Sequence, residues 1–334
     1  MSTKSYKIIA DKTKMTHEEW LSLRKFSIGG SEIAVAIGVS RWSTPFQLWS
    51  QKTGRSEKQI SNTESMYWGT IMEPILREEF SKRTGYLVRE ANCIFASTKY
   101  EYLTANIDGY AVLSNGEFAI LEIKTASAYS DGDWIDGVPI EYYLQTQYYL
   151  YITGLKKAFV AVLLGGNTFK YIELERDEAT IEVIVQLAVN FWENYVLKDV
   201  PPPVKDLDND VLAKIYPKSK AVTISMPPEF LEVIDQYNAA KLLIEKGKSN
   251  KDEAEAKIKA FLKDAEFGVI GDFKISWKSS TRKMLSSEKI KTLLNDKQLE
   301  ECTVSSESRT LRISKLKSKN LRNDLSSPSF LAVS

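Results

Sequence analysis

The sequence predicts an α/β protein in which helices flank a central sheet and a helical extension follows. Three observations support this. Two β-rich runs predict a hairpin over residues 105–125, and helix-like and strand-like apolar patterns alternate along residues 17–198. Three consecutive prolines at 201–203 end this pattern, and the residues beyond them are charged and helical. We therefore expect one large domain at residues 1–204 and an extension at 205–334.

The helices before the prolines are predicted from caps and apolar spacing. Thr16 and Glu19 form a capping box, Ser31 follows two glycines as an N-cap, and Pro45 fits the first turn of another helix. Pro74 is expected in the first turns of its helix, where proline is tolerated. The expected helices are residues 17–26, 31–37, 44–54, 67–84, 140–153 and 179–198.

β-rich runs predict the strands. Apart from the hairpin, they lie at residues 86–89, 94–97, 158–164 and 169–174. Beyond the prolines, residues 228–265 have apolar spacing suited to a coiled coil or a helical hairpin. Two more strands are expected at residues 273–278 and 309–314, and a basic tail begins at Lys315.

The hairpin places two carboxylates opposite each other. With a three-residue loop, Leu113 faces Glu117, and the same register sets Asp108 opposite Glu122. Cross-strand partners have Cβ atoms about 4.5–5.5 Å apart, near enough for two carboxylates to share a divalent cation. Lys124 lies two residues past Glu122 and therefore on the same strand face. This trio fits either a metal site or the solvated charge ladder of an ordinary half-exposed strand.

Composition narrows the available chemistry. The chain has one histidine, His17, in the first turn of a predicted helix, where we expect it at the surface. A single histidine excludes a His-rich metal site and, at the surface, Ser-His-Asp catalysis. Two cysteines are too few for a disulfide framework. Carboxylates remain as the strong ligands, and all-oxygen sites favour Mg²⁺ or Mn²⁺. The sequence has neither a membrane-length apolar run nor a signal-peptide pattern, so we expect a cytoplasmic protein without membrane partners.

Two further features allow either an ordinary or a functional interpretation. The glycines before Ser31 give a helix N-terminus with free backbone N–H groups, and Arg24 lies close in sequence. This arrangement could hold an anion, or it could be a simple glycine turn with a serine cap. Glu73 projects from the apolar side of its helix, and either reaches solvent or joins a site.

Five motifs, taken in order, resemble the YqaJ-like viral recombinases, the lambda-type alkaline exonucleases, whose core is a PD-(D/E)XK nuclease fold. They are Arg24 with Ile28-Gly29-Gly30-Ser31, Trp68-Gly69-Thr70-Ile71-Met72-Glu73-Pro74, Asp108-Gly109, Glu122-Ile123-Lys124 and Gln145-Thr146-Gln147. Each motif is weak alone, but their order and spacing fit over residues 20–200. Residues 271–277 also resemble an extension that many phage members carry. The resemblance implies a central mixed sheet flanked by helices.

The resemblance implies catalytic roles for five residues. Asp108, Glu122 and the backbone carbonyl of Ile123 would ligate Mg²⁺ or Mn²⁺, and Glu73 would complete the site of a second ion. Lys124 would orient or deprotonate the attacking water. Gln145 would lie beside the two ions.

The resemblance also implies contacts between named residues and the DNA substrate. Arg24, Ser31 and Gly30 would hold a terminal 5′ phosphate, and Tyr142 would support the site one helical turn before the catalytic glutamine. Asn106 stands where some members have a hydroxyl side chain that contacts phosphate. The proline of the PD signature is replaced by isoleucine in this chain.

The implied activity is Mg²⁺-dependent hydrolysis of linear double-stranded DNA from its 5′ ends, which leaves 3′ single strands for phage-type recombination by strand annealing. Family members form ring-shaped trimers and pass the 3′ single strand to a single-strand annealing protein. The resemblance therefore implies a trimer and such a partner, and it implies that the protein acts in a bacterial host cell. Two alternatives remain. One is an endonuclease or single-strand nuclease on the same core, and the other is a non-catalytic DNA-binding or scaffold protein.

Overall fold

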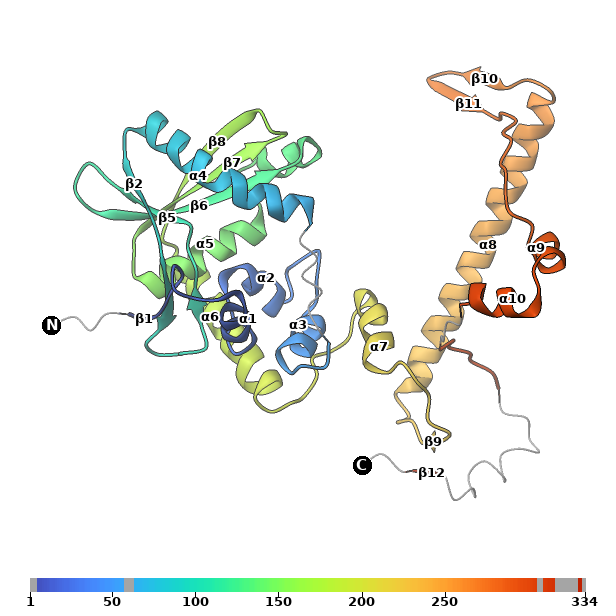
Figure 1. The fold of residues 1–334 in the computed structure, drawn as a ribbon, viewed down its shortest axis with the longest axis horizontal. Coiled ribbons are helices and arrows are strands. Elements are labelled where there is room, and N and C mark those ends of the chain that lie inside the picture. Colours follow the sequence, from blue (N-terminus) through green and yellow to red (C-terminus); the bar gives the residue numbers. More distant parts are fainter. Residues whose placement is uncertain (1–4, 57–62, 305–308, 316–329, 332–334) are drawn as a thin grey trace. The chain divides into compact units, whose positions relative to one another are not determined.

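The computed structural model of the protein contains two compact units, Met1–Tyr216 (unit 1) and Pro217–Ser334 (unit 2) (Figure 1). The structure describes residues 5–56, 63–304, 309–315 and 330–331. The basic tail beyond Lys315 lies outside the described residues. Unit 1 includes the short helices that follow the three prolines. The division at residue 204 into a nuclease domain and an extension stays a prediction about function.

The central sheet of unit 1 has the strand order β2-β5-β6-β7-β8. The strands are β2 (Leu87–Glu90), β5 (Gly109–Val112), β6 (Phe118–Ala126), β7 (Lys157–Leu164) and β8 (Thr168–Glu175). β6 and β7 pair in parallel and the other neighbours pair antiparallel, so the sheet is mixed. Parallel neighbours need a crossover, which η2 (Ala128–Trp134) and the helix α5 (Ile140–Thr153) provide.

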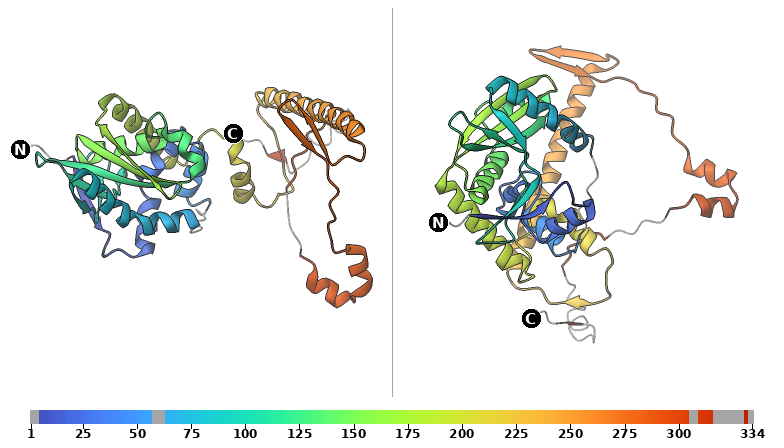
Figure 2. Two further views of the ribbon diagram at one scale, coloured as in Figure 1. Left: turned by 90° about the horizontal axis from the view of Figure 1, so that it is seen from above. Right: turned by 60° about the vertical axis from the view of Figure 1, so that its left-hand side comes forward.

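Helices cover both faces of this sheet (Figures 1 and 2). On one face, α4 (Glu64–Thr84) packs Phe80 in a cluster with Leu121 and Ile123. On the other face, α5 packs Tyr148 in a cluster with Ile120. Side chains alternate along a strand, so both side-chain rows of β6 are enclosed. The strand that carries the predicted carboxylate is therefore central and buried, not half-exposed.

Smaller elements complete unit 1. A second sheet has the strand order β1 (Tyr6–Asp11), β3 (Cys93–Ser97), β4 (Thr104–Ala105). The remaining helices are α1 (His17–Lys25), η1 (Gly30–Glu32), α2 (Ile33–Ala36), α3 (Pro45–Lys52), α6 (Glu178–Asn190), the π-helical turn η3 (Phe191–Val196), η4 (Asp206–Asp208) and α7 (Asn209–Ile215). The last two follow the prolines, and α7 packs Leu212 and Ile215 against the core of unit 1.

Unit 2 is built around one long helix, α8 (Phe230–Leu262) (Figure 1). The hairpin β10 (Phe267–Ile270)–β11 (Phe273–Ser276) follows, and then the short helices α9 (Ser287–Leu293) and α10 (Asp296–Cys302). The two-residue strands β9 (Thr223–Ile224) and β12 (Phe330–Leu331) pair in parallel. The continuous α8 contradicts the predicted alternative of a helical hairpin.

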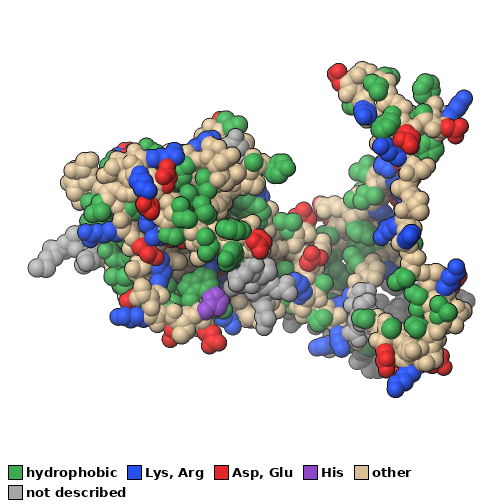
Figure 3. Space-filling view, turned by 45° about the horizontal axis from the view of Figure 1, so that its top comes forward, with side chains coloured by type: hydrophobic (Ala, Val, Ile, Leu, Met, Phe, Trp, Pro, Cys, Tyr) green, Lys and Arg blue, Asp and Glu red, His purple; other side chains and the backbone are tan. Residues whose placement is uncertain are grey.

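The predicted fold class is confirmed: unit 1 is an α/β core with a central mixed sheet between helices, as expected of a PD-(D/E)XK nuclease. The hairpin register is also confirmed, since Gly109 pairs with Leu121 and Val112 with Phe118. His17 is exposed, as expected, and is the only purple side chain in Figure 3. Among the described residues, no helix combines the length and apolar character that a membrane span requires.

Three local predictions are wrong. Ser31 is not an N-cap: it lies inside η1, and the Glu32 carboxylate accepts the Gly29 N–H (3.1 Å) instead. Pro74 lies in the interior of α4, because Thr63 caps that helix at its start and the helix begins earlier than its apolar pattern indicates. The described residues 309–314 form no strand.

Candidate active site

The central hairpin brings Asp108 and Glu122 together. Asp108 lies just before β5, and extending the observed register sets it opposite Glu122 on β6. Its Oδ2 accepts a hydrogen bond from the backbone N–H of Ile123 (2.8 Å), which fixes the carboxylate across the hairpin. Glu122 is only 2% exposed, so it is a buried carboxylate at the centre of the sheet. A buried charge needs partners, and those partners define the site.

Two side chains share one oxygen of Glu122. Oε1 accepts hydrogen bonds from Nζ of Lys124 (2.5 Å) and from Nε2 of Gln145 (2.6 Å). Lys124 comes from the same strand face and Gln145 from the buried side of α5. The structure thus brings together three of the predicted catalytic residues.

The other oxygen of Glu122 is unpaired. Oε2 is buried and has no hydrogen-bond partner among the described residues. A buried acceptor without a partner is costly unless something else fills its coordination. A hard divalent cation bound by carboxylate oxygen would do so. Glu122, Asp108 and the carbonyl of Ile123 therefore fit the cofactor that the resemblance implies.

Glu73 reaches this region from α4 but is held by another partner. Arg77 donates a hydrogen bond to its Oε1 (2.5 Å) and also lies 3.4 Å from Glu90. In the described part of the chain, no three His, Cys, Asp or Glu side chains are close enough to bind one ion together. To serve a second ion, Glu73 would have to turn away from Arg77.

The electrostatics of the cluster are those of crowded buried acids. Burial and the neighbouring Asp108 raise the pKa of Glu122 to about 8, although Lys124 opposes this shift. Burial and Asp108 likewise raise the pKa of Glu73, with Arg77 opposing. Burial disfavours the charge on Lys124, but Glu122 and Asp108 outweigh it and raise its pKa. A bound cation would supply the positive charge that the ionised carboxylates lack and would lower the pKa of Glu122 and of Glu73.

Lys124 is also held by an aromatic ring. Its Nζ lies 5.0 Å from the ring centroid of Tyr142, which stacks on the buried Trp134 (centroids 5.7 Å apart, planes at 28°). A cation over an aromatic face is attracted by the ring quadrupole. Tyr142 therefore supports the site through Lys124.

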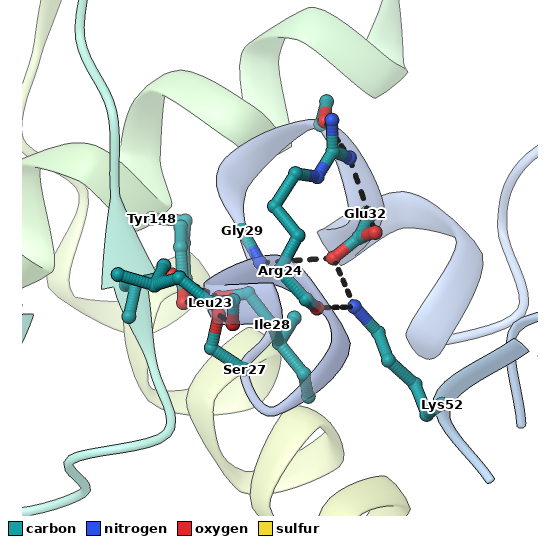
Figure 4. A network of polar contacts seen from close by, with 10 residues as sticks. Leu23, Arg24, Ser27, Ile28, Gly29, Glu32, Lys52 and Tyr148 are labelled. Atoms are coloured by element: carbon teal, nitrogen blue, oxygen red, sulfur yellow. Dashed lines mark hydrogen bonds and ion pairs between the residues drawn. The ribbon is translucent and has the colours of Figure 1, made fainter. Parts of the chain in front are cut away.

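Two of the predicted phosphate residues, Arg24 and Ser31, belong to a network of polar contacts beside η1, in which Figure 4 labels Arg24. Nη2 of Arg24 lies 3.3 Å from the Ser31 hydroxyl and 3.1 Å from Oε1 of Glu32. The buried Glu32 also accepts from Nζ of Lys52 (2.7 Å). Burial opposes ionisation of Glu32, but Lys52 and Arg24 lower its pKa. Two cations, Arg24 and Lys52, thus lie at this network. Because η1 and α2 are short, the Arg24 guanidinium, and not a helix dipole, would attract an anion.

A small pocket of about 60 Å³ opens at this network. Its lining includes Arg24, Gly30, Ser31, Asn106 and Tyr149. Oδ1 of Asn106 is buried without a partner among the described residues, so the pocket has a polar group to satisfy.

Tyr149 connects the pocket to the acid cluster. Its hydroxyl accepts a hydrogen bond from Nε2 of Gln145 (3.1 Å), the same amide that binds Glu122. Its ring forms a wall of the pocket beside Gly30. The two predicted sites are therefore neighbours that share one buried side chain.

Sequence reasoning missed three residues of this arrangement: Glu32, Lys52 and Tyr149. The Gln145–Tyr149 contact could have been found, because residues four apart on a helix are neighbours. The Glu32–Lys52 pair carries no spacing signal, since it joins two different helical segments.

The comparisons with known proteins agree with the predicted family. The family model of the YqaJ-like viral recombinase domain matches residues 19–156. The YqaJ protein of Bacillus subtilis (strain 168) is 36% identical over 305 residues, which cover 89% of this chain and 94% of that protein. The chain belongs to the YqaJ-like viral recombinase family. Because the match with the Bacillus relative is longer than unit 1, this YqaJ-like protein shares much of unit 2 with it.

Solved structures similar to this YqaJ-like chain include two exonucleases. One is the alkaline exonuclease LHK-Exo from Laribacter hongkongensis, with a TM-score of 0.47 and 21% identity, covering 55% of this chain and 94% of that chain. The other is a phage related exonuclease from Haemophilus somnus 129PT, with a TM-score of 0.39 and 11% identity, covering 54% of this chain and 99% of that chain.

Proposed function

We propose that the protein is a Mg²⁺-dependent exonuclease that hydrolyses linear double-stranded DNA from its 5′ ends and leaves 3′ single strands. One observation carries the proposal. The buried Glu122, with one unpaired oxygen beside Asp108 and Lys124, shares Gln145 and Tyr149 with a cationic pocket that suits a terminal phosphate. Family membership supports the same activity through the motifs that the sequence shares with YqaJ-like recombinases.

The residues divide the work of phosphodiester hydrolysis. Asp108, Glu122 and the carbonyl of Ile123 would hold the metal, with Mn²⁺ as a substitute and Glu73 serving a second ion. Bound Mg²⁺ would neutralise the charge that develops on the phosphate oxygens. The Lys124 ammonium, which contacts Glu122 and the ring of Tyr142, would hold the attacking water. Gln145 keeps the Glu122 carboxylate oriented.

The pocket would select DNA ends. Arg24 and Ser31 would bind a terminal 5′ phosphate, and Asn106 would donate to the same phosphate through Nδ2. Only an enzyme that binds ends needs such a pocket, so its position next to the acids favours an exonuclease over an endonuclease on the same core.

The deciding experiment compares three DNA substrates in Mg²⁺ and in EDTA. They are linear duplex with 5′-phosphate ends, the same duplex with 5′-hydroxyl ends, and a closed circle. We expect Mg²⁺-dependent loss of the linear DNA only, faster with 5′ phosphate. Cutting of the circle would instead establish the endonuclease alternative. No cleavage of any substrate would favour the non-catalytic binding protein.

Assembly and partners extend this proposal. A ring-shaped trimer around DNA and transfer of the 3′ strand to a single-strand annealing protein follow from the family resemblance. Both would serve phage-type recombination in a bacterial cytoplasm.

A further inference from the structure

The hairpin β10–β11 in unit 2 presents a basic and aromatic face that the nuclease proposal does not use. Antiparallel pairing sets Phe267 opposite Ser276 and Val269 opposite Lys274. Paired residues share a face of a hairpin, and Lys278 continues the same alternation. We call this surface, made of Phe267, Val269, Lys274, Ser276 and Lys278, the outer face.

Two lysines of the outer face lie at one aromatic ring. Nζ of Lys274 is 4.6 Å and Nζ of Lys278 is 4.5 Å from the ring centroid of Phe267, which is 43% exposed. Within the described residues, no Asp or Glu forms an ion pair with either lysine. By contrast, Lys251 and Lys257 on α8 are paired with Glu255 and Glu253.

The opposite face of the hairpin is attached to α8. A side chain at Gly268 would come within 2.9 Å of Leu262, which is buried at the end of that helix. Ile275 on the same face is half-buried. Trp277 is the next residue of this alternation, and Nζ of Lys259 on α8 lies 5.6 Å from the centroid of its ring. These contacts fix the base of the hairpin by one face, whose tip residues Ile270 and Phe273 stay exposed, and they do not involve the outer face.

The surroundings are basic as well. From the start of the hairpin, residues 267–283 contain four Lys or Arg against one Asp, although the whole chain has a net charge of only +1. In the space-filling view, hydrophobic and basic side chains, with some acidic ones among them, lie next to one another at the end of unit 2 that carries the hairpin (Figure 3). Exposed rings interleaved with unpaired cations are the surface chemistry that binds nucleic acid strands.

We propose that the outer face binds single-stranded DNA: Lys274 and Lys278 would move from the Phe267 ring to the adjoining phosphates, and a base would stack on the ring that they leave. A duplex would offer phosphates but no free base to the ring, so the aromatic component favours a single strand. That this strand is the one left by unit 1 rests on the proposed exonuclease function. Tethering both sites on one chain would then raise the local concentration of the strand at the hairpin.

The test measures binding of a fluorescent circular single-stranded DNA to the full-length protein in EDTA by anisotropy. A circle has no ends and EDTA prevents cleavage, so the end-binding pocket of unit 1 contributes little. We expect Phe267→Ala to raise the Kd roughly five- to 100-fold, the range expected for loss of one stacked base. Lys274→Gln with Lys278→Gln should raise the Kd and lower the slope of log K against log salt by about 1.4.

A matched control separates the outer face from general charge. The double variant Lys251→Gln with Lys257→Gln removes the same charge from α8, where both lysines are already paired, and should bind the circle nearly as wild type does. Equal binding by wild type and both hairpin variants would overturn the proposal. So would displacement of the circle by poly-glutamate as readily as by unlabelled single-stranded DNA, because it would point to an acidic protein partner. Release of nucleotides from linear duplex in Mg²⁺, measured separately, tests the exonuclease and leaves the binding result independent of it.

Discussion

Gly30 and Tyr149 lie so close that a Cβ atom on residue 30 would be 2.2 Å from Cε1 of the tyrosine ring. No side chain fits in this space without moving the ring. The ring forms a wall of the candidate phosphate pocket, and its hydroxyl binds the Gln145 amide that orients Glu122. The contact between residue 30 and the ring therefore sets the distance between the end-binding pocket and the acid cluster.

The variant Gly30→Ala should displace the Tyr149 ring and impair cleavage. We expect the free energy of unfolding to fall by about 1–3 kcal/mol through overpacking, and kcat/KM for 5′-phosphorylated duplex to fall with it. Gly29→Ala is the matched control, because its Cβ would meet only the Glu32 carboxylate, at 3.9 Å, and its backbone is extended. Chemical denaturation and single-turnover cleavage measure both effects. Equal activity of the two variants would show that Tyr149 does not couple the sites.

The variant Asp108→Asn should abolish cleavage without unfolding the protein. The asparagine Oδ1 can still accept the Ile123 N–H, so the hairpin keeps its hydrogen bond. The loss of the charge removes a metal ligand, and kcat should fall by about a thousandfold or more, since a bound ion supplies several kcal/mol of charge stabilisation. DNA binding should be largely retained, because the acids repel phosphate when no metal is bound. Full activity of this variant would refute the site assignment.

The ring of Tyr142, rather than its hydroxyl, should matter for Lys124. Tyr142→Leu removes the aromatic face at 5.0 Å from Nζ and should lower kcat by about five- to 30-fold. Tyr142→Phe keeps the face and should retain most of the activity. Single-turnover rates with saturating Mg²⁺ compare the two. A phenylalanine variant as slow as the leucine variant would assign the effect to the hydroxyl.

Acid should destabilise unit 1 partly through Glu32. Its pKa in the folded state lies below the ordinary value of 4.5, because Lys52 and Arg24 outweigh the effect of burial. A carboxyl group whose pKa is lower in the folded protein than in the unfolded chain stabilises the fold at pH values above the unfolded pKa. This stabilisation is lost as the pH falls through the folded-state pKa. Denaturation of wild type should therefore show a free energy of unfolding that decreases below about pH 4.5.

The variant Glu32→Gln tests this loss of stability at acid pH. It removes the Glu32 carboxylate from the buried Lys52 ammonium, so we expect a loss of about 3–5 kcal/mol at neutral pH and a flatter dependence on acid. Glu78→Gln is the control, since Glu78 forms an exposed pair with Lys82 and should have little influence on stability. A neutral-pH stability equal to that of wild type would show that the Glu32 network is not structural.

The sequence was informative where the contacts are local or periodic. The position of Asp108 opposite Glu122 follows from a short hairpin loop and from side chains that alternate along each strand, and the structure has the predicted register. The burial of Glu122 was not predictable, because it depends on two helices that cover opposite faces of the sheet. The Glu32–Lys52 pair is similar: its members lie in different segments, and only the fold brings them together. Local patterns thus identified the candidate site residues, whereas tertiary packing determines their charge and neighbours.

The boundary of unit 1 is set by packing beyond the prolines. Asp208 is fully buried and accepts a hydrogen bond from the Thr44 hydroxyl (2.5 Å), while Gln47 donates to the carbonyl of Leu207 (2.6 Å). Together with α7, these contacts attach residues 206–216 to α3 and the core.

A chain that ends at residue 216 should therefore fold and retain single-turnover cleavage of duplex DNA, if unit 2 serves strand binding, partners or assembly. A chain that ends at residue 205 keeps the whole predicted nuclease domain but loses Asp208, leaving Thr44 without its buried partner. We expect the shorter chain to be less stable by about 1–3 kcal/mol or more, since a buried polar group and the apolar contacts of α7 are both lost. Thermal unfolding and single-turnover assays of the two chains make the comparison. If the chain ending at 216 is folded but cannot cut DNA, unit 2 belongs to the active core.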